Sequence, residues 1–400
     1  MKIISLETIR LEEFPNLFWL QIHTDNGLTG LGESFFGPQA AEAYIHETAA
    51  QLLLNQDVFS IEKISWQLRN GYLGFASSGA EMRGLSAIDI ALWDLVGQAT
   101  QQPIYNLLGG LSRNRVQTYN TCAGYRYVRG TEGQLTDNWG LSSSDGPYED
   151  LDGFLYRADE LALSLLEQGI TAMKIWPFDP YAEASNGTYI SNQDLDKALE
   201  PFRKIRNAVG DKMDIMVEFH SLWNKPTALK IFKALEPFNP FWFEDPIKMN
   251  SSQALSDLAH RTSVPICASE TIATRFGYQE FLSKDAIGVV MPDLSWCGGL
   301  SEARKIAAQA ETYHLPLAPH DCTGPVVFIA SCHLSLNAPN TLMQESVRAF
   351  YTGWYPEIVT EMPRIENGYI YPMTGYGLGT RLRPEIRQRS DAHIRVSKHS

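Results

Sequence analysis

Residues 1–112 change from a strand pattern to a helix pattern. Apolar and polar residues alternate in three short stretches, and this period of two predicts strands over 3–13, 18–23 and 28–33. The stretches that follow repeat their apolar residues with a helical period, which predicts helices over 39–54, 60–70 and 81–98. A small sheet followed by helices is typical of an α+β domain.

From residue 116 a strand pattern and a helix pattern alternate repeatedly. The apolar runs predict eight strands, over 116–121, 171–175, 214–218, 241–244, 265–269, 286–291, 315–319 and 341–345. Helical stretches lie between them, over 152–168, 193–209, 226–236, 252–261, 275–283, 299–313 and 324–337. Eight parallel strands joined by helices close into a (β/α)8 TIM barrel, here over residues 113–350 with a weak or truncated last helix.

Two further segments do not fit the alternating pattern. Residues 351–400 are rich in Gly, Pro and Tyr, and we expect this C-terminal segment to pack back onto the first domain. Residues 123–150 have no clear period and follow the first barrel strand, so we expect them at the active face of the barrel. Two interpretations stay open for this long loop, a substrate-facing lid and a surface insertion.

Three of the predicted barrel strands end in a glutamate. Glu218, Glu244 and Glu270 follow one another at equal steps, 244−218 = 26 and 270−244 = 26 residues, which is about the length of one βα unit. Equal steps bring the three carboxylates to the same height on adjacent parallel strands, where they repel one another unless a cation lies between them. Oxygen ligands without Cys or paired His favour Mg²⁺. A solvated acidic rim is the alternative.

Polar side chains also end other barrel strands. Lys174 lies near the end of the second strand, either as a functional group or as an ordinary rim lysine. His220 follows Glu218 by two residues, so it should face the same cavity, as a catalyst or as half of a polar pair. Glu345 ends the eighth strand and could accept a hydrogen bond from a substrate hydroxyl.

The sixth and seventh strands end in a candidate acid–imidazole pair. Asp293 and His320 are 320−293 = 27 residues apart, so neighbouring strands bring them together. A carboxylate bonded to one imidazole nitrogen fixes the tautomer and leaves the other nitrogen free as a base. The pair therefore indicates proton abstraction at the barrel mouth.

Charge and cysteine content narrow the class of protein. The net charge of −13, with no basic stripe to offset it, argues against a nucleic-acid partner or an acidic membrane surface. A bound divalent ion can reverse the local sign, so an anionic substrate is still possible. Five cysteines without CxxC spacing predict reduced thiols in a cytoplasmic protein, and we expect neither a signal peptide nor a membrane span.

These strand-end groups together resemble the enolase superfamily, and within it the mandelate racemase / muconate lactonizing enzyme group. The resemblance extends to Gly32-Glu33, to the stretch 86–94 (SAIDIALWD) and to 107–110 (LLGG), and so covers nearly the whole chain. It implies a modified barrel whose first domain, residues 1–112, acts as a cap that the C-terminal segment completes. It also implies Mg²⁺ as the cofactor and a homo-oligomeric assembly.

Details of the resemblance point to sugar-acid dehydratases of the galactonate type. Racemases of the group carry a second lysine where this chain has Trp176, so a two-base racemase using that lysine is not expected, and Trp176 becomes a candidate for contact with the substrate. His220, followed by Asn224-Lys225-Pro226, is similar to the general acid of those dehydratases. Glu218 departs from that type, which usually has Asp there, and Ser221-Leu222-Trp223 also differs, so the particular sugar is left open.

The resemblance implies a Mg²⁺-dependent dehydration of an aldonate to a 2-keto-3-deoxy acid through an enediolate. In this hypothesis Glu218, Glu244 and Glu270 hold the ion, and Lys174 offsets the charge of the enediolate. His320 with Asp293 takes the C2 proton, His220 protonates the leaving hydroxide, and Glu345 binds substrate. The alternatives are an epimerase, racemase or cycloisomerase, and a non-catalytic binding or regulatory barrel. We expect specificity to lie in segments 12–18, 71–84 and 123–150.

Overall fold

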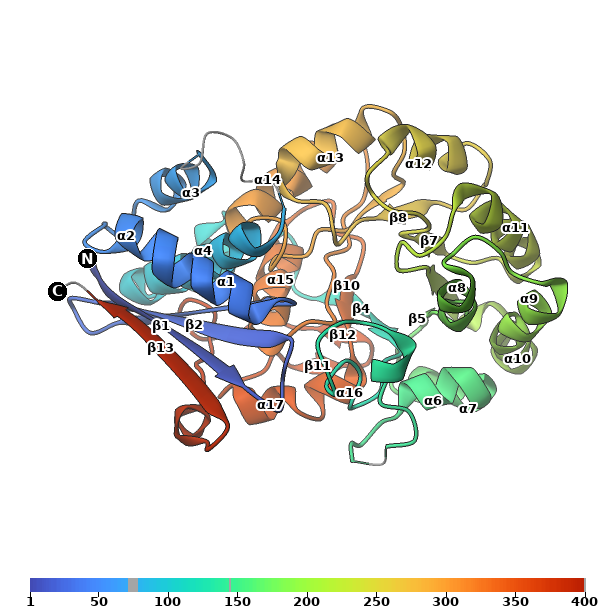
Figure 1. The fold of residues 1–400 in the computed structure, drawn as a ribbon, viewed down its shortest axis with the longest axis horizontal. Coiled ribbons are helices and arrows are strands. Elements are labelled where there is room, and N and C mark those ends of the chain that lie inside the picture. The colour runs from blue at the N-terminus through green and yellow to red at the C-terminus, as the bar shows by residue number, and fades with distance from the viewer. Residues whose placement is uncertain (71–77, 144, 399–400) are drawn as a thin grey trace.

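The computed structural model describes residues 1–70, 78–143 and 145–398 of the 400-residue chain. Figure 1 shows two parts side by side, an N-terminal cap built on a small sheet and a larger barrel of strands and helices. Within the described residues no helix combines the length and the apolar character that crossing a membrane requires. All five cysteines are free thiols.

The cap is built on a four-stranded antiparallel sheet that contains both ends of the chain. Its strands lie in the order β13-β1-β2-β3, so the last strand of the protein pairs with the first, and Figure 1 shows the two termini at the same edge. The expected return of the C-terminal segment to the first domain is thus made by one strand. The bounds are β1 (Ile3–Leu11), β2 (Leu17–Thr24), β3 (Thr29–Phe35) and β13 (Ala392–Lys398).

One long buried helix covers the cap sheet. The helix α4 packs against β3 at very short range, because a Cβ atom on Gly32 would lie 2.0 Å from the carbonyl oxygen of Ala87. Glycine is therefore required at this crossing. The predicted helix over 39–54 is interrupted by a π-helical turn. The cap helices are α1 (Pro38–Tyr44), η1 (Ile45–Ala49), α2 (Ala50–Leu53), α3 (Ile61–Asn70), α4 (Ala80–Thr100) and α5 (Ile104–Leu107).

Parallel strands form the barrel in sequence order, and the last pairs with the first. The predicted seventh strand is reduced to a single bridge residue, Leu317, which pairs with Val290 and Thr341. Pro316 and Pro319 lack the N–H groups that a longer ladder requires, and this explains the short strand. The strands are β4 (Val116–Thr121), β5 (Ala172–Ile175), β6 (Asp214–Glu218), β7 (Trp242–Glu244), β8 (Ile266–Ala268), β9 (Val289–Val290) and β10 (Gln344–Ser346).

Helices surround the barrel and confirm the predicted (β/α)8 class, including the weak last helix, which is replaced by two four-residue helices. The predicted helix 152–168 is broken at Arg157 and the predicted helix 193–209 at Leu199, just before Pro201. The helix α8 was not predicted. The bounds are α6 (Asp150–Tyr156), α7 (Ala158–Glu167), α8 (Asp179–Ser185), α9 (Asn192–Ala198), α10 (Glu200–Val209), α11 (Lys225–Leu235), α12 (Ser252–Ala259), α13 (Thr274–Leu282), α14 (Gly299–Thr312), α15 (Pro325–Asn337), α16 (Arg348–Tyr351) and α17 (Tyr355–Ile358).

Short elements complete the chain. A hairpin extends the barrel sheet next to β4, and four 3₁₀ turns lie in the connections. They are β11 (Ile365–Glu366), β12 (Tyr369–Ile370), η2 (Thr136–Asn138), η3 (Gly210–Lys212), η4 (Glu236–Phe238) and η5 (Pro384–Gln388).

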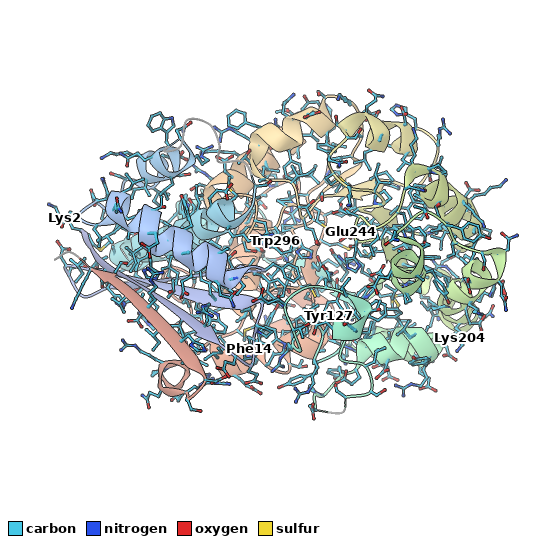
Figure 2. All side chains as sticks on the ribbon, in the orientation of Figure 1. Lys2, Phe14, Tyr127, Lys204, Glu244 and Trp296 are labelled. Carbon is cyan, nitrogen blue, oxygen red and sulfur yellow. The ribbon has the colours of Figure 1, made fainter. Side chains whose placement is uncertain are left out.

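The long loop after β4 joins the cap to the barrel mouth. The Nδ2 atom of Asn16 in the cap donates hydrogen bonds to the carbonyl oxygens of Val128 and Thr131 in the loop, at 2.8 and 3.0 Å. Phe14 of the cap and Tyr127 of the loop border the same small cavity (Figure 2). Two of the segments expected to set specificity therefore touch each other. Of the third, 71–84, residues 71–77 lie outside the described residues.

Candidate active site

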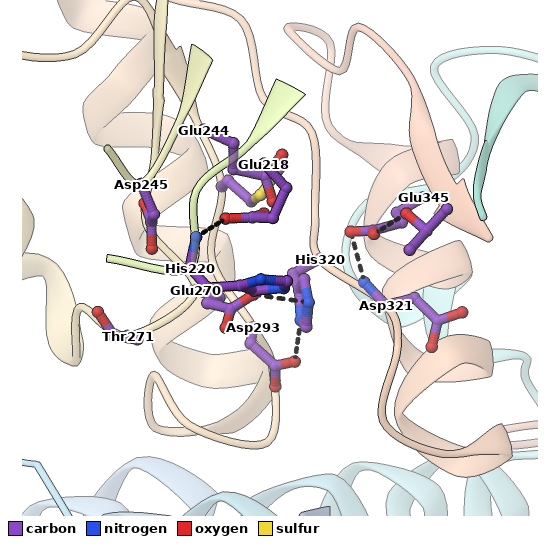
Figure 3. Close-up of polar contacts among 12 residues, drawn as sticks. Glu218, His220, Glu244, Asp245, Glu270, Thr271, Asp293, His320, Asp321 and Glu345 are labelled. Atoms are coloured by element: carbon purple, nitrogen blue, oxygen red, sulfur yellow. Dashed lines mark hydrogen bonds and ion pairs between the residues drawn. The ribbon is translucent and has the colours of Figure 1, made fainter. Parts of the chain in front are cut away.

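Three glutamates converge at the carboxyl ends of β6, β7 and β8. Glu218 and Glu244 lie opposite each other in the parallel ladder, and Glu270 follows the end of β8 by two residues. One oxygen of each carboxylate lies within 4.8 Å of the others, and Figure 3 shows the three side chains together. The three carboxylates therefore form one cluster, but the predicted equal height holds only for Glu218 and Glu244, because Cys267 and not Glu270 lies opposite Glu244.

The local backbone fixes two of these carboxylates. The Oε1 atom of Glu218 accepts hydrogen bonds from the backbone N–H groups of Phe219 and His220, at 2.9 and 2.6 Å. His220 has a positive φ of 47°, so the chain turns sharply where β6 ends. The Oε2 atom of Glu244 accepts from Trp242 Nε1 at 2.9 Å. Glu218 is thus held by its own turn, and Glu244 by a side chain of its own strand.

Lys174, on β5, is the buried cation of this cluster. Its Nζ atom lies 2.8 Å from Glu345 Oε1 and 3.4 Å from Glu218 Oε2, and it also contacts Glu244. Burial raises the pKa of Glu218 to about 7, and burial together with the nearby Glu218 raises the pKa of Glu244 well above its usual range. One lysine therefore does not balance the buried acids. A hard divalent cation such as Mg²⁺ fits a donor set of three carboxylates with this excess of negative charge.

His320 and Asp293 form the predicted pair between the sixth and seventh strand positions. Asp293 Oδ2 lies 2.7 Å from His320 Nδ1, while Asp293 Oδ1 accepts from the backbone N–H of Ser295 at 2.6 Å. The sequence predicted a free second nitrogen, but His320 Nε2 lies 2.7 Å from Glu270 Oε2. That part of the prediction was wrong, because the Glu270 side chain contacts the imidazole of His320 in addition to joining the glutamate cluster.

Glu270 and His320 change each other's charge. Burial alone would raise the pKa of Glu270, but the facing His320 brings it down to about 2. Burial also opposes a charged imidazole, yet Glu270 and Glu345 raise the pKa of His320 well above its usual range. While Glu270 faces the ring, each group therefore favours the charged form of the other.

A second acid–imidazole pair was not predicted from the sequence. Asp179 Oδ2 lies 2.6 Å from His220 Nδ1, and Asp179 is buried at the first position of α8. Burial opposes the charged ring, but Asp179 and Glu270 raise the pKa of His220 above its usual value. The dipeptide Asp179-Pro180 is a typical helix start and could have revealed α8, although not its contact with His220.

Trp176 does not point into the barrel as the sequence suggested, whereas Glu345 lies in the site as predicted but already has partners there. Trp176 was expected to contact substrate, but it is only 1% exposed and packs edge-on against the His220 ring, with centroids 5.7 Å apart. The strand β5 ends at Ile175 and Pro177 follows, so the alternation that would point residue 176 into the barrel does not continue. Both oxygens of Glu345 are already occupied, by Lys174 and Thr121 and by the backbone N–H of Asp321 at 3.0 Å.

A pocket of about 320 Å³ opens at Glu270, between the barrel and the cap. His220, Asp245 and Glu270 line it from the barrel. Trp296 also lines it and stacks on the His320 ring, with centroids 5.6 Å apart. Arg83 reaches it from the first turn of α4. Asp245, Trp296 and Arg83 were not singled out from the sequence, because no local pattern aligns the cap with the barrel.

Comparisons with known proteins agree with this architecture. Residues 5–109 match the family model "Mandelate racemase / muconate lactonizing enzyme, N-terminal domain", and residues 157–386 match "Enolase C-terminal domain-like". The chain is 30% identical over 395 residues to a D-galactonate dehydratase of Pectobacterium atrosepticum, covering 96% of this chain and 93% of that protein. It is 31% identical over 390 residues to a D-galactonate dehydratase of Ralstonia nicotianae, covering 95% and 91%.

Solved structures of similar proteins share the whole fold. An enolase of the mandelate racemase subgroup from Agrobacterium tumefaciens is 54% identical, with a TM-score of 0.88 over 100% of this chain and 99% of the other. An enolase from the Sargasso Sea environmental genome is 45% identical, with a TM-score of 0.89 over the same shares of the two chains. The similarity therefore covers both the cap and the barrel.

Proposed function

Because the chain belongs to the mandelate racemase / muconate lactonizing enzyme group of the enolase superfamily, we propose that it dehydrates a sugar acid to a 2-keto-3-deoxy acid. The observation that carries the proposal is the presence of two imidazoles, each bonded to an aspartate, beside one cluster of three glutamates. Removal of water from adjacent carbons requires one group that takes a proton and another that gives one. The D-galactonate dehydratases that the chain resembles support the same reaction class.

The first half of the reaction is removal of the proton at C2. This proton is weakly acidic, because its loss places a second negative charge next to the substrate carboxylate. Glu218, Glu244 and Glu270 would hold Mg²⁺, which would supply positive charge to offset the charge of the enediolate. Lys174 adds a second positive charge at the same end of the site. His320 accepts the proton at Nε2, while Asp293 holds its Nδ1 side.

The second half is loss of the hydroxyl at C3. His220 lines the pocket, and its Nδ1 is held by Asp179, which directs Nε2 toward the substrate. The proton from His220 Nε2 leaves with the hydroxide as water, and the C3–O bond breaks as the C2–C3 double bond forms. The enol product then tautomerises to the 2-keto acid.

Glu345 and Trp176 act next to this chemistry. The carboxylate of Glu345 contacts the ammonium group of Lys174 and keeps it in place. We propose that Glu345 also lies near the substrate oxygens. Trp176 supports the His220 ring from behind, instead of contacting the substrate.

The reaction class is tested by incubating the protein and Mg²⁺ with a stereochemically complete set of sugar acids and measuring 2-keto acid formation. Mass spectrometry of the product distinguishes dehydration, which loses one water, from epimerisation, which changes no mass. Epimerisation is the second candidate, because two imidazoles beside one substrate can remove a proton from a carbon and return one to it. Conversion of no sugar acid by either route would contradict the proposal and favour a non-catalytic barrel.

A further inference from the structure

Arg83 is the charged side chain that the described part of the cap contributes to the active-site pocket. It projects from the first turn of α4, while the other lining residues of the cap, Phe36, Ser78 and Gly79, are uncharged. Glu270 and Asp245 line the same pocket from the barrel. The pocket therefore has an acidic wall from the barrel and one guanidinium on the side of the cap.

Arg83 has no counter-ion among the described residues. No carboxylate of the described residues lies within ion-pair distance of it, and its Nε atom is buried without a hydrogen-bond partner among them. Asp293 and Glu81 only act on it from farther away, and burial lowers the pKa of the guanidinium because the charged form loses water contacts. Two other buried cations have carboxylate partners. Lys174 forms ion pairs with three glutamates, and Arg348 Nε lies 2.7 Å from Asp150 Oδ2.

A half-buried guanidinium without a partner loses hydration and gains nothing in return unless a ligand supplies the missing anion. The planar guanidinium group donates two parallel N–H bonds to a carboxylate or a phosphate, and a neutral hydroxyl cannot accept both in that way. Under the proposed function, the three glutamates and Lys174 on the barrel side receive the reacting carboxylate of the substrate. That leaves Arg83 for a different group of the same molecule.

We propose that Arg83 binds a second anionic group at the far end of the sugar acid, so that the preferred substrate is a sugar diacid or a sugar acid with a terminal phosphate. This inference rests on the proposed function for the end of the substrate that reaches the glutamates. It goes further by assigning a specificity group in the cap. The sugar chain then lies between the acidic residues of the barrel and Arg83 of the cap, which line the same pocket.

The test compares three substrates with the same configuration at their central carbons, ending in a carboxylate, a phosphate or a hydroxymethyl group. We expect kcat/KM to be about 10- to 100-fold higher for the best anionic-ended compound than for the hydroxymethyl compound. The R83Q variant should bring this ratio close to one. R83K keeps the charge but loses the two parallel donors, so it should retain part of the ratio. The better of the two anionic ends identifies carboxylate or phosphate as the natural group.

A matched control removes a positive charge from the cap without touching the pocket. Lys63 lies exposed on α3 and, among the described residues, donates only to Gln56, so K63Q should keep the wild-type ratio. Thermal unfolding of all variants checks that each is folded, and R83K serves if R83Q is not. A wild-type preference for the hydroxymethyl compound, or an equal loss for all three substrates in R83Q and R83K, would overturn the inference.

Binding measured without turnover separates this inference from the proposed function. Calorimetry with Mg²⁺ and the inactive H320N variant gives affinities for the diacid and the hydroxymethyl acid, with and without R83Q. Tighter diacid binding that depends on Arg83 supports the anion subsite, even if no sugar acid is dehydrated and the proposed function fails. If sugar acids are dehydrated but neither the substrate preference nor the affinity depends on Arg83, the anion subsite is contradicted and the proposed function is not.

Discussion

The two acid–imidazole pairs have the same first contact but different surroundings. In each, a carboxylate oxygen lies 2.6–2.7 Å from Nδ1, which leaves Nε2 for chemistry. At His320, Nε2 is already bonded to Glu270, one of the three clustered glutamates. At His220, Nε2 makes no hydrogen bond with any residue the structure describes, and the ring lines the pocket.

This difference teaches that the proposed base and acid depend on the cation in different ways. Glu270 contacts both His320 and the other two glutamates. A cation that bound its carboxylate at the cluster would therefore release Nε2 of His320. Asp179 is not part of that cluster, so His220 keeps its partner in either case. The pairs can therefore be separated by measuring C2 hydrogen exchange and dehydration independently.

Metal removal has the largest expected effect, because it acts on both proton abstraction at C2 and loss of the C3 hydroxyl. Exhaustive chelation should abolish 2-keto acid formation and exchange of the C2 hydrogen with D₂O, since the enediolate then lacks its main compensating charge. Addition of Mg²⁺ should restore both, as followed by NMR and by a 2-keto acid assay. Undiminished activity after chelation would mean that the three glutamates do not serve a required cation.

The H320N variant should be the next most damaging change. It removes the base, so dehydration and C2 exchange should fall together by about 10²–10⁴-fold. His393 is an exposed histidine on β13 whose ring forms a hydrogen bond only with Glu12 among the described residues, so H393N is a matched control and should behave as wild type. Retained exchange in H320N would assign proton abstraction to another group.

The H220N variant should separate the two steps. Loss of the acid should reduce dehydration by about 10²-fold or more while C2 exchange continues, because His320, Asp293 and the glutamates are unchanged. The ratio of exchange to dehydration, measured by NMR in D₂O, is the readout. Complete dehydration activity in this variant would contradict the role of His220, and equal loss of both steps would mean that the pairs do not act separately.

The D179N variant should have the smallest effect. Asn keeps an oxygen that can accept from His220 Nδ1 but loses the charge, so dehydration should fall about tenfold with C2 exchange intact. The matched change D293N acts on the other pair and should lower exchange and dehydration in equal proportion. If D179N also lowers exchange in that proportion, Asp179 supports the barrel mouth as a whole and does not position His220 in particular.

Much of this site could be read from the sequence, because parallel strands convert equal spacing into equal height. That rule brought Glu218 level with Glu244 and paired Asp293 with His320, whereas Glu270 joins the cluster from three residues beyond the position opposite Glu244. The alternation of strand and helix patterns predicted the barrel and its weak last helix, and the family resemblance implied that the first domain is a cap. The prediction failed for Trp176, where the strand ends one residue earlier and the side chain turns into the core.

The parts of the site that were not predicted from the sequence depend on contacts between distant segments, which no local sequence pattern indicates. Asp179 lies on a short helix within a connection between strand and helix, and its contact with His220 depends on how that helix packs. Arg83 meets the pocket only because the cap docks over the barrel. The bond between Glu270 and His320 depends on side-chain conformations, which strand spacing does not determine.

The pairing of β1 with β13 also governs how the molecule can assemble. The two strands are neighbours in the sheet, but 392−11 = 381 positions separate the end of one from the start of the other. The cap is thus complete only after the ribosome has made every strand of the barrel. During that time the outer edge of β1 offers unpaired backbone groups to any other extended chain. Nascent molecules are therefore most exposed to association with one another at this edge, and a chaperone that covers it would protect them.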